Sequence, residues 1–136
     1  MTDRCLTCEY FILSFVPSVL SDESIPIGVL LQEIETVATE KELRFAGARF
    51  VQDLRALPLV DLEADETLIA KAILEMQTIV KRAFASGRHN ELNALLQELL
   101  NANSGLCAFG PYACRAAGNP ELDLEALFER SIRRQA

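Results

Sequence analysis

The chain has 136 residues, of which 50% are hydrophobic and 24% are charged, and its formal net charge is −7 at pH 7. A chain of this length buries one core, so residues 1–136 are expected to form a single domain. The negative charge argues against direct nucleic-acid binding, which needs clustered lysine and arginine. Serine and proline interrupt the apolar run from Tyr10 to Leu20, which argues against a membrane span or a secretory signal. We therefore expect a cytoplasmic protein.

Two segments near the N-terminus have the composition of buried strands. Residues 10–16 are apolar at both alternating sets of positions, and residues 26–34 are similar. Strands that are apolar on both faces lie in the interior of a sheet, so both are predicted to be central strands. The connection from Pro17 to Pro26 is polar and is predicted to be an exposed loop. A third, weaker strand is expected over residues 42–45.

Helical periodicity begins after the strands. A short helix is expected over residues 50–57, because the apolar residues there have helical spacing. It must end before Pro58. A long amphipathic helix is predicted from an N-cap at Asp65 to a stop at Gly87. A second amphipathic helix is predicted from an N-cap at Asn90 to the turn that ends at Gly105. The two are expected to form a helical hairpin.

The C-terminal part of the chain combines one more strand with one more helix. Residues 105–116 are strand-like around a break at Gly110 and Pro111. Asn119 is predicted to cap a terminal helix that has Pro120 at its first position. The sequence thus predicts an α+β fold, in which an antiparallel sheet of three to five strands packs against three to four helices.

Four segments of the sequence are specific enough to suggest a family: Tyr10 to Pro17, Glu23 to Leu31, Arg55 to Leu57, and Pro120 to Arg130. On these segments the chain resembles a bacterial family of uncharacterised proteins, domain of unknown function 3037. The resemblance covers nearly the whole chain. It implies a fold and a bacterial origin but no activity. The family usually has Asn where this chain has Pro26, so any hydrogen bond made by that Asn is absent here.

The four cysteines carry the sharpest local chemistry. The cytosol keeps thiols reduced, so we expect free thiols rather than a disulfide framework. An alternative is a small zinc-binding module, because Cys5 and Cys8 have the spacing of two zinc ligands. Cys107 and Cys114 would complete the set if residues 109–112 formed a tight turn. Zinc is then the cofactor of this alternative, and otherwise no cofactor is expected.

No recognisable catalytic motif is present. There is no Walker loop, no Gly-rich dinucleotide turn, no nucleophile elbow and no paired-histidine motif. The one histidine, His89, is expected in the turn between two helices. The protein is therefore predicted not to be an enzyme, and no catalytic residue is assigned. Acidic clusters at residues 61–66 and 121–125 suit helix N-termini, although an acidic inhibitor of a nucleic-acid enzyme is a further alternative.

The favoured function is a non-enzymatic protein-binding or regulatory module. A sheet that is apolar on both faces needs cover from helices, a second copy or a partner, so a protein partner or a homodimer is expected. The polar loop is the expected contact, with Asp22, Glu23 and Pro26 as partner-binding residues.

Overall fold

The computed structural model describes residues 4–16, 24–53, 62–87, 89–102, 105–115 and 118–132. Within these ranges it contains one four-stranded antiparallel sheet and three helices. The elements are β1 (Arg4–Phe15), β2 (Ile25–Val37), β3 (Glu40–Phe50), α1 (Leu62–Ser86), α2 (His89–Ala102), β4 (Leu106–Cys114) and α3 (Pro120–Ser131). The predicted α+β class is therefore confirmed.

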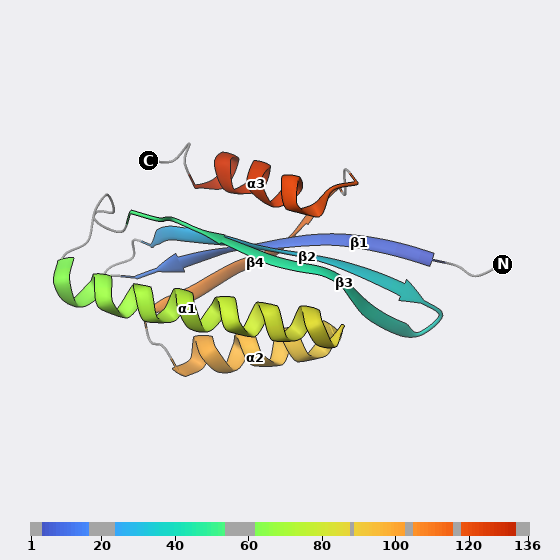
Figure 1. Ribbon diagram of the computed structural model, residues 1–136, viewed down its shortest axis with the longest axis horizontal. Coiled ribbons are helices and arrows are strands. Elements are labelled where there is room, and N and C mark those ends of the chain that lie inside the picture. Colours follow the sequence, from blue (N-terminus) through green and yellow to red (C-terminus); the bar gives the residue numbers. More distant parts are fainter. Residues whose placement is uncertain are drawn as a thin grey trace.

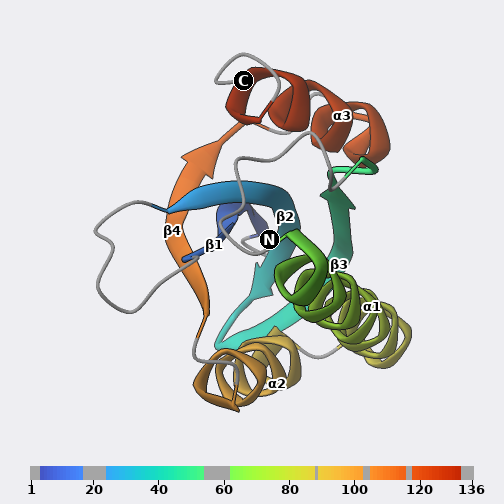
Figure 2. The ribbon, with the colours of Figure 1, turned by 90° about the vertical axis from the view of Figure 1, so that its left-hand side faces the viewer.

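The sheet is sandwiched between unequal helical layers. α1 and α2 lie against one face and α3 lies alone against the other (Figure 1). The strand order is β3-β2-β1-β4, so β3 and β4 are the two edges. α1 packs chiefly on β3, α2 on β3 and β4, and α3 on β2 and β3 (Figure 2). Of the helices that the structure describes, none is both long and apolar enough to cross a membrane.

The two strands predicted to be central, β1 and β2, are central, and both are longer than predicted. Leu30 and Ile34 of β2 belong to the core beneath α1 and α2, whereas Val29 and Leu31 belong to the core beneath α3. The alternation of a strand thus supplies two cores from one segment. Pro26 lies within β2, opposite Ser14 of β1, rather than in a loop.

The third strand, predicted over residues 42–45, is confirmed and is longer, reaching the first residue of a predicted helix. β3 extends to Phe50, which pairs with Gly28 of β2 and is buried. The predicted helix over residues 50–57 is therefore wrong at its start, because the ladder to β2 overrides the helical spacing. Val51, Gln52 and Asp53 are not helical either, and residues 54–57 lie outside the described residues.

The helical hairpin is confirmed, with different starting points. Asp65 and Asn90 lie inside α1 and α2 rather than at their N-caps. The stop after α1 is as predicted: Gly87 has a φ of 71°, a left-handed conformation that glycine adopts without a steric penalty. Its carbonyl oxygen accepts a hydrogen bond from the N–H of Leu43 at 2.8 Å, which fastens the end of α1 to β3.

The segment around Gly110 and Pro111 is an edge strand and not a tight turn. β4 pairs with β1 on both sides of this dipeptide, and the register shifts between Tyr10 and Ile12. The dipeptide has a cis peptide bond and adds an extra residue to β4 at this point. Cys107 and Cys114 are therefore placed near opposite ends of one strand.

The start of α3 is as predicted. The Oδ1 atom of Asn119 accepts hydrogen bonds from the N–H groups of Glu121 at 3.1 Å and Leu122 at 3.3 Å, and Pro120 occupies the first turn. These bonds satisfy two amide groups that have no partner inside the helix.

Replacing Asn119 with alanine removes this cap. We expect Asn119→Ala to lower the free energy of unfolding by about 1 kcal/mol, measured by urea denaturation. Asn119→Asp is the matched control, because aspartate caps a helix equally well. Equal losses in both variants would contradict a capping role.

Candidate functional site

The sheet face beneath α3 is covered unevenly, and the side chains of β4 are the least covered. A helix with side chains is about 10 Å wide and strands are spaced by about 4.8 Å, so one helix covers about two strands. α3 lies chiefly on β2 and β3, so Tyr10 and Ile12 of β1 pack at the margin of its core and β4 lies beyond it. We call Tyr10, Ile12, Phe109 and Tyr112 the tyrosine face; the two β1 residues are partly buried and the two β4 residues are exposed.

The tyrosine face is built from cross-strand pairs. Tyr10 lies opposite Tyr112, with ring centroids 5.3 Å apart, and Ile12 lies opposite Phe109. Phe109 and Tyr112 are 44% and 42% exposed, which is high for large apolar side chains. The pairing holds the rings on a rigid surface, because opposite residues of an antiparallel pair project to the same face.

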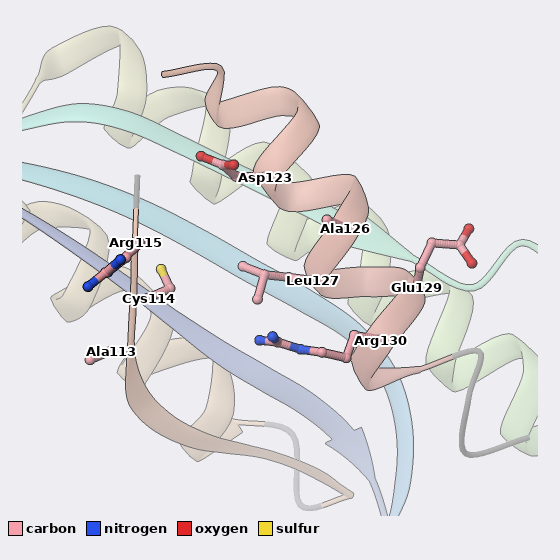
Figure 3. Close-up of a pocket in the computed structure, with 8 residues that line it drawn as sticks. All are labelled: Ala113, Cys114, Arg115, Asp123, Ala126, Leu127, Glu129 and Arg130. Carbon is pink, nitrogen blue, oxygen red and sulfur yellow. The ribbon is translucent and has the colours of Figure 1, made fainter. Parts of the chain in front are cut away.

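A groove of about 840 Å³ adjoins the tyrosine face and lies between the end of β4 and α3 (Figure 3). We call it the α3–β4 groove. It is lined by Ala113, Cys114, Arg115, Asp123, Ala126, Leu127, Glu129 and Arg130. Four of these side chains are apolar, including the disulfide-bonded Cys114, and four are charged, so the groove offers both kinds of contact.

Two arginines give the groove its binding chemistry. Arg130 extends from α3 toward β4, and Arg115 lies at the opposite wall (Figure 3). Within the part of the chain that the structure describes, neither guanidinium has a hydrogen bond or ion pair, whereas Asp123 and Glu129 both have partners. The groove thus holds uncommitted positive charge, suited to carboxylates, on a protein of net charge −7.

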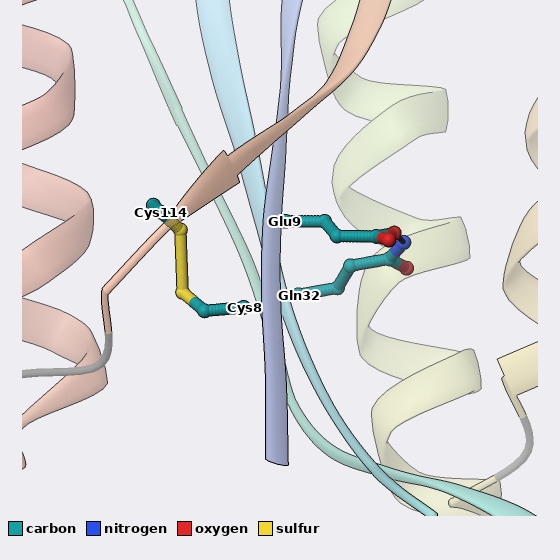
Figure 4. Close-up of a disulfide and its surroundings, with 4 residues drawn as sticks. All are labelled: Cys8, Glu9, Gln32 and Cys114. Carbon is teal, nitrogen blue, oxygen red and sulfur yellow. Dashed lines mark hydrogen bonds between the residues drawn. A yellow bond between two sulfur atoms is a disulfide. The ribbon is translucent and has the colours of Figure 1, made fainter. Parts of the chain in front are cut away.

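A disulfide joins β1 to β4 at the groove. Cys8 and Cys114 are directly opposite in the ladder, with Cα atoms 5.3 Å apart, and their sulfur atoms are bonded on the α3 side of the sheet (Figure 4). Glu9 and Gln32 project to the other side, where the Nε2 of Gln32 donates to Glu9 at 3.2 Å. The expectation of four reduced thiols is therefore wrong for this pair, because strand pairing brings the two cysteines within bonding reach.

The structure does not assemble the four-cysteine zinc site. Cys107 pairs with Ser14, which is six residues along β1 from Cys8 and so about 20 Å away. Its Sγ lies 3.8 Å from the carbonyl oxygen of Ser14, and burial raises the pKa of its thiol. Among the described residues, no three histidine, cysteine, aspartate or glutamate side chains group to hold a metal ion. The side chain of Cys5 is outside the described part.

The disulfide closes a loop spanning 106 positions of sequence, so it strongly restricts the unfolded chain. We expect reduction, or the Cys8→Ser and Cys114→Ser double substitution, to cost roughly 2–5 kcal/mol of unfolding free energy. Guanidinium denaturation with and without dithiothreitol measures this loss.

Cys107→Ser is the matched control for the disulfide, and its stability should respond to dithiothreitol as the wild type does. An unfolding midpoint that did not move on reduction in either protein would contradict a stabilising disulfide.

Glu33 is a buried acid next to the disulfide. It pairs with Cys8 on one side and Phe45 on the other, so it faces α3. Burial is the larger cause that raises the pKa of its carboxyl, and the negative charge of Asp123 raises this pKa further. Two acids therefore oppose each other between β2 and α3, and Glu33 holds its proton more readily than in the unfolded chain.

The raised pKa of Glu33 predicts a pH-dependent stability. Glu33 binds a proton more readily in the folded state than in the unfolded chain, so its ionisation near neutral pH lowers the free energy of unfolding. This loss of stability disappears as the pH falls toward the ordinary pKa of glutamate. We expect Glu33→Gln to be more stable than the wild type at neutral pH, by a margin that shrinks at pH of about 5. Urea denaturation at both pH values tests this, with exposed Glu98→Gln as control; an unchanged margin would contradict it.

Pro26, one of the three residues predicted to bind a partner, lies apart from this groove. Pro26 is opposite Ser14, about 20 Å along the sheet from Cys8. Asp22 and Glu23 lie outside the described residues, so their role stays a prediction, and His89 begins α2. Sequence reasoning missed Arg115, Arg130 and Tyr112. The aromatic residues flanking a Gly-Pro pair were the available signal, but they were interpreted as a turn.

The chain belongs to the family described as "Protein of unknown function (DUF3037)", whose sequence profile matches residues 10–132. The matched range contains the whole tyrosine face and every residue that lines the α3–β4 groove. No curated protein and no solved structure matches the chain.

Proposed function

We propose that the chain is a non-enzymatic protein-binding module whose contact surface is the tyrosine face together with the α3–β4 groove. The observation that carries this proposal is the short α3 layer, which leaves the aromatic side chains of Phe109 and Tyr112 on β4 exposed. The same surface continues into a groove with two uncommitted arginines.

The composition of this surface supports contact with protein. Tyrosine, phenylalanine and arginine are enriched where binding energy concentrates, because each buries a large area and keeps a polar or cationic group for specificity. Tyr10 and Tyr112 already contact each other, so little side-chain freedom is lost when a partner covers them.

The charges define the partner. Arg115 and Arg130 favour carboxylates at the rim of the contact, and the tyrosine face favours an apolar centre. We therefore propose a partner protein with an apolar patch beside acidic side chains. Asp22 and Glu23 of the polar loop are proposed as a second contact. The geometry of the groove gives no evidence for or against this second contact.

Site-specific photo-crosslinking tests this contact. Tyr112 is replaced by the photoreactive residue p-benzoylphenylalanine, which keeps an aromatic ring at the site, and the chain is irradiated in cells that express it naturally. We expect a discrete adduct, with a yield roughly tenfold lower when Arg115→Glu and Arg130→Glu are added, because both charge-assisted bonds are lost.

The matched control places the photoreactive residue at Leu74, a 66% exposed position of α1 on the other side of the sheet. The same adducts from both positions, or a yield that ignores charge reversal, would contradict the proposed surface. An adduct with twice the mass of the chain would identify a second copy in place of a different partner.

A further inference from the structure

The Cys8–Cys114 disulfide joins a residue that lines the α3–β4 groove to a residue that is buried. Cys114 is partly exposed, and Figure 3 shows its sulfur atom among the side chains that line the groove. Cys8 is 6% exposed and belongs to the core beneath α3. Because thiol–disulfide exchange depends on which sulfur a thiolate can reach, attack from the groove is directed to Cys114.

Two arginines accompany Cys114 in the groove. Arg115 follows it in the sequence, and Arg130 extends from α3 toward β4 (Figure 3). A guanidinium lowers the pKa of a neighbouring thiol, which raises the thiolate fraction, and it binds carboxylates through charge-assisted hydrogen bonds. Asp123 and Glu129 line the same groove, but each of them already has a partner. The groove thus favours a thiol that also carries carboxylates.

The groove has room for such a molecule. Its volume of about 840 Å³ is within the range of small-molecule sites, roughly 300–1,000 Å³. Ala113, Ala126 and Leu127 supply apolar contacts along its walls. A thiol the size of a short peptide can therefore enter with its carboxylates at the arginines and its sulfur at Cys114.

A buried acid lies on the far side of the disulfide. Glu33 is directly opposite Cys8 in the ladder, so both side chains face α3 and their Cβ atoms are about 5 Å apart. Burial and the charge of Asp123 raise the pKa of the Glu33 carboxyl, so this group keeps a proton more readily than an ordinary glutamate. Thiols are ordinarily much weaker acids than carboxyl groups. A thiolate that forms at Cys8 is therefore expected to take this proton, because a buried charge without a partner is costly.

We propose that the α3–β4 groove is a thiol–disulfide exchange site for a small thiol that carries carboxylates. The incoming thiolate attacks the Sγ of Cys114, so a new S–S bond forms there while the Cys8–Cys114 bond breaks. The electron pair leaves on the Sγ of Cys8, which takes a proton from Glu33. The carboxylate of Glu33 regains its proton from water.

A second molecule of the same thiol completes the reaction. Its thiolate attacks the small-molecule sulfur of the mixed disulfide and releases Cys114, which is protonated by water. Two small thiols are thus oxidised to one disulfide, and the two cysteines gain two electrons and two protons. This chemistry goes beyond the proposed protein contact, and its tests use no protein partner.

The rate of reduction of the folded protein tests the proposal. The free thiols are first blocked with iodoacetamide; glutathione, which has two carboxylates, is then added, and the released cysteines are trapped with N-ethylmaleimide and counted by mass spectrometry. We expect a rate that rises in proportion to the glutathione concentration and does not change in urea below the unfolding transition. A rate that ignored glutathione concentration, or rose with urea, would show a disulfide that opens only on unfolding and would overturn the proposal.

Charge substitutions test the role of the arginines. The Arg115→Gln and Arg130→Gln double variant should react about tenfold more slowly with glutathione and at nearly the wild-type rate with uncharged 2-mercaptoethanol. The matched control is the Lys81→Gln and Arg82→Gln double variant, which makes the same change of charge on exposed positions of α1. Equal rates with glutathione in the two double variants would contradict a site for acidic thiols.

The remaining two steps have readouts of their own. Tandem mass spectrometry after a short reaction of the wild type should place the glutathione adduct on Cys114, and an adduct on Cys8 would overturn the proposed direction of attack. Glu33→Gln should slow reduction about tenfold with both glutathione and 2-mercaptoethanol, because the proton donor is lost, whereas Glu98→Gln should not. A wild-type rate in Glu33→Gln would overturn the role of Glu33.

Discussion

The rest of the structure depends on the pairing of β1 with β2. Both are long strands, and each carries apolar side chains on both of its faces. Their ladder runs from Arg4 and Val37 to Phe15 and Ile25, and it brings segments that are close in sequence into the centre of the sheet. Leu30 and Leu31 are adjacent in sequence and both fully buried, in different cores. Such a pair is stable only if both faces are covered, so helices are required on each side.

The two faces meet this requirement unequally. α1 and α2 are 25 and 14 residues long and cover one face, whereas α3 has 12 residues and covers β2 and β3. Gly47 allows this close approach, since a Cβ there would lie 3.1 Å from the side chain of Leu124. Arg49 then fixes the other end of the contact, with a 3.2 Å ion pair to Glu125 and its guanidinium over the ring of Phe128. α3 is thus held toward β3, and β4 is joined to the sheet by its ladder to β1, by the Cys8–Cys114 disulfide and by aromatic pairs.

What the sequence could predict follows from how local each signal is. The buried strands at residues 10–16 and 26–34, the stop at Gly87 and the cap at Asn119 are encoded by neighbouring residues, and all four are confirmed. The helix expected from Phe50 was wrong, because its pairing with Gly28 is a contact between distant residues. The groove was missed for the same reason. The strand register that places Cys8 opposite Cys114 joins positions more than a hundred residues apart. The position of α3 relative to β4 is not specified by the periodicity of the helix.

The two edge strands of the sheet differ in how far they are covered. At β4 the backbone edge is interrupted by Pro111, so exposed rings and the neighbouring arginines dominate, and contact there depends on side-chain complementarity. At β3 the edge is covered: Ala46 is 4% exposed, α1 packs over the strand, and the ring of Phe84 lies against that of Phe45. The Arg49–Glu125 pair holds α3 on β3, so the helix stays away from β4 and the α3–β4 groove lies open between them.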